Sequence, residues 1–241
     1  MNKPELPTIL GHRGIASLAP ENTLGAVREA ARQGVRWVEM DVSLLADDTP
    51  VIYHDDSLDR LSDRRGVLAE LRLDELADVN VAAHFDGWGR EPLPTLKQML
   101  RLLQEQGLGF NLEIKDQGLD PGRVVKAIAR DLAGFDPAQM VISSFNYALL
   151  EECRRQLPVF ARGLLCEQLD ANWRDALETL DAFSLHCFWQ GLDESAITQA
   201  KAAGYKVLAW TVNDVEKGRK LLQLGVDALI TDLPQGYSSV A

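Results

Sequence analysis

The segments RWVEMDVSL (residues 36–44) and VIYH (residues 51–54) together decide which fold this chain can adopt. Both are rich in β-branched, aromatic and other apolar residues, which favours strands. The stretch between them includes Ala46-Asp-Asp-Thr-Pro50 and is far too short for a parallel crossover, which needs a dozen or more residues. The two strands are therefore predicted to form an antiparallel hairpin. If its turn centres on Asp47 and Asp48, His54 lies roughly opposite Asp41.

With the hairpin strand 51–54 set aside, eight strand-like runs alternate with amphipathic helical runs along the chain. The predicted strands are Thr8–Leu10, Arg36–Leu44, Gly109–Ile114, Met140–Ser144, Phe160–Leu165, Ala182–Leu185, Lys206–Thr211 and Ala228–Ile230. The predicted helices are Thr23–Gln33, Leu96–Gln106, Pro121–Leu132, Tyr147–Gln156, Trp173–Thr179, Glu194–Ala203 and Val215–Leu224. Such alternation indicates a parallel sheet with helices outside. Eight strands in 241 residues predict an α/β fold, a TIM (β/α)₈ barrel.

Residues 56 to about 94 show no clear barrel period. We predict that they form a small insertion after the hairpin, lying over the barrel mouth, within one domain that spans residues 1–241.

Two capping boxes are predicted at helix starts, Thr95 with Gln98 and Asn213 with Glu216. Asp136, followed by Pro137, is a further predicted N-cap. Glycines predicted to end helices are Gly34, Gly107, Gly204 and Gly225.

The composition bounds the partners and the compartment. The formal net charge is -11 and no basic run is present, so we expect neither a nucleic-acid partner nor stable membrane association. The three cysteines have no zinc-site spacing, which favours reduced thiols. An apolar leader and a stretch of about 20 apolar residues are both absent, so the sequence predicts a cytoplasmic protein. The sequence leaves the oligomeric state open.

Carboxylates recur with strand spacing on two predicted strands. Glu39 and Asp41 are two residues apart and therefore share one face of their strand. On the next strand, Asn111, Glu113 and Lys115 alternate with apolar neighbours, so one face is polar toward the barrel axis. Oxygen-only ligands suit a hard cation, Mg²⁺ or Ca²⁺. Two structural alternatives stay open: the first pair points to solvent, or Glu113 and Lys115 form a simple ion pair.

Histidines end the first predicted strand and the hairpin strand. TIM-barrel sites lie at the C-terminal ends of the strands, which places His12 and Arg13 for catalysis or binding. His54, opposite a candidate metal ligand, forms with His12 a plausible acid–base pair beside a metal-bound phosphodiester. The alternative is a polar loop and a structural histidine, the role that we assign to His84 and His186. Trp210 is either an apolar wall at the mouth or a core aromatic residue.

These residues belong to an ordered series of motifs that spans nearly the whole chain. In chain order the motifs are Gly11-His12-Arg13-Gly14, Pro20-Glu21-Asn22-Thr23, Glu39-x-Asp41, His54-Asp55, Leu93-Pro94-Thr95-Leu96, Leu112-Glu113-Ile114-Lys115, Ser144-Phe145, Trp210-Thr211-Val212-Asn213 and Thr231-Asp232-x-Pro234. The set resembles the glycerophosphodiester phosphodiesterase family, and the chain is similar to its cytoplasmic bacterial members. The resemblance implies a TIM barrel with a small insertion and the hydrolysis of glycerophosphodiesters, a small-molecule substrate class, to sn-glycerol 3-phosphate and an alcohol.

The resemblance also implies residue roles. The divalent cation is expected on Glu39, Asp41 and Glu113. His12 and His54 are expected to be general base and general acid.

By the same resemblance, Arg13 and Lys115 hold the phosphate.

Two other functions remain as alternatives. A catalytically dead scaffold would need a lost ligand or histidine, and none is missing. Another barrel enzyme, such as an aldolase or a sugar-phosphate isomerase, often relies on a Schiff-base lysine or a glutamate base without the carboxylate trio. Release of glycerol 3-phosphate from a diester separates these alternatives from the leading hypothesis.

Overall fold

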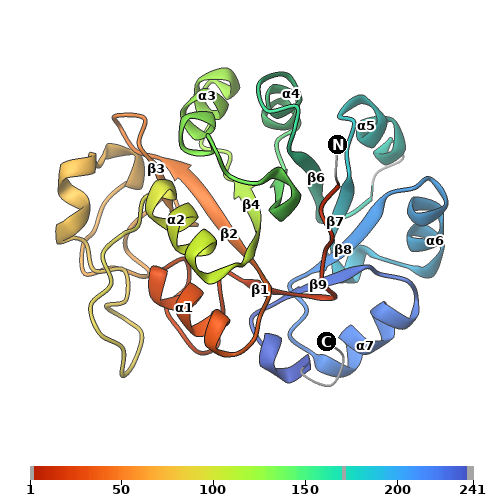
Figure 1. Cartoon of the computed structure of the whole chain (residues 1–241), viewed down its shortest axis with the longest axis horizontal. Coiled ribbons are helices and arrows are strands. Elements are labelled where there is room, and N and C mark those ends of the chain that lie inside the picture. Colours follow the sequence, from red (N-terminus) through yellow and green to blue (C-terminus); the bar gives the residue numbers. More distant parts are fainter. Residues whose placement is uncertain (1–2, 170–171, 238–241) are drawn as a thin grey trace.

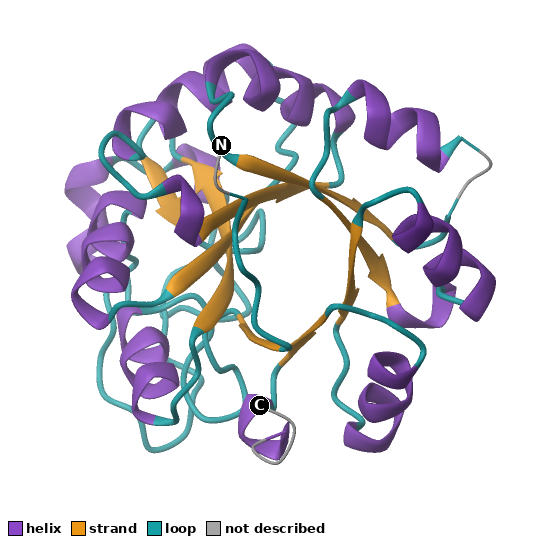
Figure 2. Ribbon diagram, turned by 45° about the vertical axis from the view of Figure 1, so that its right-hand side comes forward, coloured by secondary structure: helices purple, strands orange, loops and turns teal. Residues whose placement is uncertain are grey.

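The computed structural model describes residues 3–169 and 172–237, in which a closed ring of parallel strands is surrounded by helices (Figures 1 and 2). The strands are β1 (Ile9–His12), β2 (Trp37–Leu44), β3 (Pro50–Ile52), β4 (Gly109–Ile114), β5 (Met140–Ser144), β6 (Ala161–Cys166), β7 (Ser184–Phe188), β8 (Lys206–Trp210) and β9 (Ala228–Thr231). All neighbours in the ring are parallel, and β1 pairs with both β2 and β9, which closes the barrel. The predicted TIM barrel is confirmed.

Seven α-helices of the described residues lie outside this ring. They are α1 (Leu24–Arg32), α2 (Leu96–Gln106), α3 (Pro121–Asp131), α4 (Tyr147–Gln156), α5 (Trp173–Thr179), α6 (Glu194–Ala202) and α7 (Val215–Gln223). Each was predicted to within about a residue at both ends. The predicted capping box of Thr95 and Gln98 is present at α2. At α7 the N-cap is Asp214, not Asn213, because the Asp214 side chain accepts from the first-turn N–H groups.

The hairpin forms as predicted, with a register shifted by one residue. β3 runs antiparallel to β2 with Val42 opposite Ile52, and the N–H of Tyr53 donates to the carbonyl of Asp41. Tyr53, rather than His54, is therefore directly opposite Asp41. His54 lies beyond the end of β3 and is not paired with a residue of β2.

β7 is the strand whose bounds differ most from the prediction. The sequence predicted a strand ending at Leu185, whereas β7 continues to Phe188. The polar residue His186 suggested that the strand ends before it. His186 is instead fully buried inside the barrel, where its Nε2 lies 2.8 Å from the Ser184 hydroxyl. This contact gives one nitrogen of the buried ring a hydrogen-bond partner.

Side chains on each strand alternate between the helices and the barrel axis. On β2, the residues Val38, Met40 and Val42 pack in the large apolar cluster beneath the helices. Inside the barrel, apolar side chains such as Trp37 and Leu208 pack together in a separate cluster. An apolar plug of this kind, with polar groups nearer the C-terminal strand ends, is what confines a barrel site to the mouth.

The segment between β3 and α2 contains two short 3₁₀ helices, Leu68–Glu70 and Leu73–Asp78. Its own apolar cluster, which includes Leu58, Leu76 and Val79, packs on hairpin residues. In Figure 1 it lies beside β3, at the edge of the ring. Among the described residues, no helix is long and apolar enough to cross a membrane.

Candidate active site

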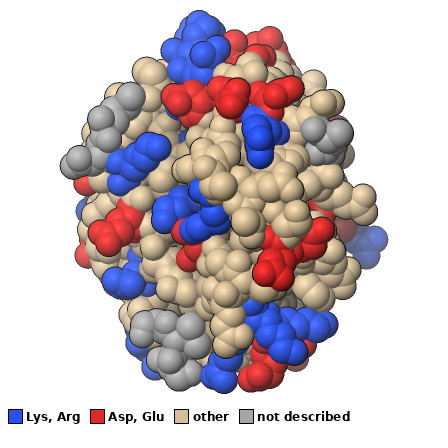
Figure 3. Space-filling model, turned by 90° about the vertical axis from the view of Figure 1, so that its right-hand side faces the viewer, with Lys and Arg blue, Asp and Glu red and all other residues tan. Residues whose placement is uncertain are grey.

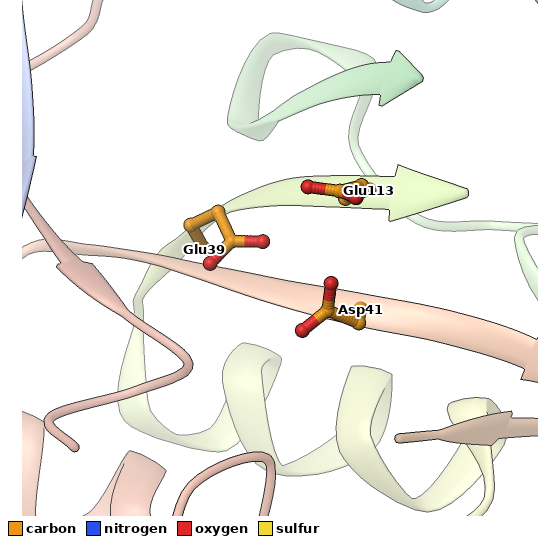
Figure 4. A group of neighbouring side chains, drawn as sticks. All are labelled: Glu39, Asp41 and Glu113. Atoms are coloured by element: carbon orange, nitrogen blue, oxygen red, sulfur yellow. The ribbon is translucent and has the colours of Figure 1, made fainter. Parts of the chain in front are cut away.

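Three carboxylates meet at the mouth of the barrel, where β2 and β4 run side by side (Figure 4). The parallel register places Asp41 directly beside Glu113, and Glu39 precedes Asp41 by two residues on the same face. One oxygen from each of the three side chains lies within 4.8 Å of the others. Glu39 and Asp41 are buried, and Glu113 is nearly so. The alternative in which Glu39 and Asp41 face solvent is wrong.

Burial makes this arrangement unfavourable without a compensating cation. Burial and the neighbouring charges of Asp41 and Glu113 hold the pKa of Glu39 well above its ordinary value. Burial and Asp41 raise the pKa of Glu113 as well. Glu39 Oε1 has no hydrogen-bond partner in the described structure. A desolvated, unpartnered carboxylate oxygen beside two further carboxylates is a donor set that could hold a divalent cation.

Two basic side chains border the carboxylates. Arg13 Nε lies 3.5 Å from Asp41, and Lys115 Nζ lies 2.8 Å from Glu113 and 3.6 Å from Asp41. Burial alone would raise the pKa of Asp41, but the positive charges of Arg13 and Lys115 outweigh burial and lower it. The predicted Glu113–Lys115 ion pair therefore exists, but inside the cluster rather than as an isolated surface pair.

The loop after β1 has the backbone strain typical of functional sites. Arg13 adopts a φ of 50° and Asn22 a φ of 59°, a region that non-glycine residues rarely occupy. Gly11 is required because a Cβ there would lie 1.9 Å from the carbonyl oxygen of Gly14. Asn22 donates to the Asp41 carboxylate at 2.8 Å and accepts from its backbone N–H. The turn thus holds Arg13 and Asp41 in fixed positions.

His12, at the end of β1, is held from behind. Its Nδ1 lies 2.6 Å from an Asp232 carboxylate oxygen, while Nε2 is 3.8 Å from Glu39. The other Asp232 oxygen accepts from the Asn213 amide at 2.6 Å. If Nδ1 carries the proton donated to Asp232, Nε2 is left as the basic atom facing the site.

His54 is held in the same way by the next residue. Its Nδ1 lies 2.6 Å from Asp55. Asp55 in turn accepts from Arg60 at 2.6 and 2.9 Å, and this lowers the pKa of Asp55 to about 2. Burial lowers the pKa of His54, and the opposing charge of Asp41 does not outweigh it.

Aromatic rings gather at the ends of β5, β7 and β8. Trp210 packs edge-on against Phe145, at 5.5 Å between ring centres, and contacts the tilted ring of Phe188 at 5.4 Å. The Trp210 Nε1–H donates to the carbonyl of His186, which fixes its ring. Trp210 is half-buried and Phe145 exposed, so Trp210 lies at the mouth and also contacts the interior cluster.

A groove of about 460 Å³ opens beside His12 and Arg13. Its walls come from the loop after β1 and from the ends of β8 and β9, including Glu21, Asn213 and Asp232. It provides a solvent path to the histidine and the arginine.

Comparison with known proteins agrees with this geometry. The sequence model of the glycerophosphoryl diester phosphodiesterase family matches residues 12–235. The chain belongs to this family. The match runs from His12 to beyond Asp232, so the complete mouth of the barrel lies within the family domain. Membership excludes the aldolase and isomerase alternatives.

Relatives of known name or structure cover nearly the full length of this family member. A glycerophosphodiester phosphodiesterase of Caldanaerobacter subterraneus subsp. tengcongensis is 31% identical over 94% of each chain. The structure of a phosphodiesterase from Oleispira antarctica, solved in complex with the product sn-glycerol-3-phosphate, has a TM-score of 0.91 and 36% identity, covering 97% of this chain and 96% of that one. A glycerophosphodiester phosphodiesterase from Thermotoga maritima has a TM-score of 0.79 at 25% identity, covering 98% and 99%.

Sequence reasoning assigned no role to four acidic or basic residues that support the site. Glu21, Asp55 and Asp232 lie in the family motifs, which was the available signal. Arg60 lies in the segment without a barrel period, where nothing in the sequence distinguishes it from Arg64 or Arg65.

Proposed function

We propose that this protein hydrolyses glycerophosphodiesters to sn-glycerol 3-phosphate and an alcohol. The observation that carries the proposal is the buried carboxylate cluster of Glu39, Asp41 and Glu113. Beside it lie His12, at the end of β1, and His54, just after β3, each held by a carboxylate. Membership of the family and the product named for the Oleispira antarctica structure support the same substrate class.

The residues present fit a divalent cation, Mg²⁺ or Ca²⁺, held by Glu39, Asp41 and Glu113. Three oxygen donors leave coordination positions open, because these ions take six to eight ligands. When bound, the cation neutralises phosphate charge and polarises the phosphoryl group. Arg13 presents a planar guanidinium suited to phosphate oxygens, and Lys115 supplies a second positive charge at the opposite side.

His12 is proposed as the general base and His54 as the general acid. When the Nδ1–H of His12 donates to Asp232, Nε2 of the same ring is free to accept the proton of the nucleophile. His54, fixed by Asp55, protonates the leaving alkoxide. The nucleophile is either water or the substrate hydroxyl next to the ester carbon, which has the proximity advantage of a held group. In the second case a cyclic phosphate forms and is later opened by water.

The leaving alcohol is proposed to face the aromatic side of the mouth, where Trp210 forms an apolar wall.

The remaining expectations follow from charge and sequence. On the face drawn in Figure 3, Lys and Arg side chains are interspersed with Asp and Glu. Together with the net charge of -11, this supports a small-molecule substrate and no nucleic-acid partner. A cytoplasmic location without stable membrane association stays part of the proposal.

The test is a panel of glycerophosphodiesters with different head-group alcohols, assayed by coupled detection of glycerol 3-phosphate. A dialkyl phosphate without glycerol serves as the control substrate. We expect glycerol 3-phosphate from at least one diester and no turnover of the control. The proposal is wrong if no glycerophosphodiester is cleaved, or if the control is cleaved equally well.

A further inference from the structure

A chain of charged contacts joins the phosphate-binding side of the proposed site to His54. Arg13 Nη1 donates to Glu21 at 2.5 Å. Arg60 then donates to Glu21 through Nη1 and Nη2, at 2.9 and 2.8 Å. The same guanidinium donates to Asp55 through Nε and Nη2, at 2.6 and 2.9 Å. Asp55 finally holds Nδ1 of His54.

Arg60 belongs to the segment between β3 and α2, not to the barrel. It uses four of its five N–H donors on two carboxylates, a geometry that a lysine cannot reproduce. An ordinary exposed ion pair contributes little to stability. Both side chains lose conformational entropy, and solvent and salt screen the attraction between the two charges. Here both acceptors are largely buried, and each contacts a residue of the proposed catalytic group.

We infer that Arg60 is a positioning residue: together with Glu21 it fixes Asp55, and through it His54, relative to Arg13. The segment after the hairpin thereby supplies a part of the active site. Without Arg60, Asp55 would lose its bidentate partner and turn toward solvent, and His54 would lose its orientation. The inference rests on the proposed function, since it acts through the general acid.

The experiment compares Arg60→Met with Arg64→Met. Arg64 lies in the same segment, and its contact with Glu75, at 3.2 Å, lies between two side chains that are each 37% exposed. We expect Arg60→Met to lower kcat by about 10- to 100-fold, the range found when a residue that orients a metal ligand is removed. Arg64→Met should stay within about twofold, and Arg60→Lys should recover only part of the loss.

Two further readouts separate positioning from a structural role. In a His54→Ala background, Arg60→Met should cause no additional loss of kcat, because its effect passes through His54. With a nitrophenyl ester of glycerol phosphate, whose leaving group needs no proton, the Arg60→Met defect should shrink. Equal activity of Arg60→Met and Arg64→Met, or a full additional loss in the His54→Ala background, overturns the inference while the proposed function stands. Absence of glycerol 3-phosphate with the unaltered protein contradicts the proposed function itself.

Discussion

At the scale of single residues, His12 and His54 differ in what stands behind the carboxylate that holds each ring. Asp232 is backed by the neutral amide of Asn213, whereas Asp55 is backed by the guanidinium of Arg60. Each carboxylate holds its histidine through Nδ1. The division of roles between His12 as base and His54 as acid is therefore a matter for the leaving-group test.

The leaving group tests this division of roles. His12→Ala and His54→Ala should each lower kcat by about 10²-fold or more with an alkyl ester, the usual magnitude of acid–base catalysis. A phenolic ester should partly rescue His54→Ala, because the phenolate leaves without a proton, but not His12→Ala. Both variants should still melt cooperatively. Equal rescue of the two variants would refute the assignment.

His186 predicts a pH dependence of stability at another place in the barrel. Complete burial lowers its pKa to about 3, so the folded protein keeps it neutral. The unfolded chain takes up a proton below about pH 6.5, so stability is lost as the pH falls from there toward 3. Between pH 7 and pH 5 this residue alone should cost about 2 kcal/mol.

The measurement is urea unfolding of the wild type, His186→Gln and His84→Gln at both pH values. His84 is exposed and serves as the matched control. We expect the loss between pH 7 and 5 to be about 2 kcal/mol smaller in His186→Gln than in the other two proteins. The same loss in all three would show that His186 titrates normally.

At the scale of elements, the Trp37 ring of β2 occupies the space where a side chain at Gly109 of β4 would lie. A Cβ at Gly109 would lie 2.0 Å from the ring of Trp37, which packs inside the lower barrel. Gly109→Ala should therefore destabilise the protein by about 1–3 kcal/mol, the cost of overpacking a core. Gly89→Ala is the control, since no atom lies within 4 Å of its added Cβ. Equal unfolding midpoints in urea would contradict this packing.

The same two strands show why much of the fold and site was predictable. Period-two alternation on β2 and β4 is visible in the sequence, and parallel neighbours necessarily bring Asp41 and Glu113 together. The register of the hairpin was one residue off, since turn geometry and not pattern decides it. Arg60 was missed because its partners Glu21 and Asp55 meet it only through folding of a segment without periodicity.

At the scale of the whole molecule, the carboxylate cluster should make stability depend on divalent cations. Burial and like charges raise the pKa of Glu39, so in the metal-free protein this carboxyl becomes less destabilising as the pH falls through that raised pKa. A cation that binds the folded state adds about 2.7 kcal/mol at 100 times its Kd. We expect Ca²⁺ or Mg²⁺ to raise Tm near neutral pH, and progressively less at lower pH.

Thermal unfolding of wild type and Glu113→Gln after chelation, with and without added cation, measures this effect. Glu113→Gln should lose most of the cation-induced shift. Glu216→Gln, which removes an exposed carboxylate from α7, is the control and should keep the shift. A shift of the same size in Glu113→Gln would place the cation elsewhere.

The central claim is that the buried carboxylates make the barrel mouth a cation-dependent phosphodiesterase site. The most direct measurement is release of glycerol 3-phosphate from a glycerophosphodiester by wild type and Glu113→Gln, in EDTA and after cation is restored. We predict turnover by the wild type only when Mg²⁺ or Ca²⁺ is present, and a loss of turnover in Glu113→Gln under both conditions. Undiminished turnover by the chelated wild type, or by Glu113→Gln, would contradict the account.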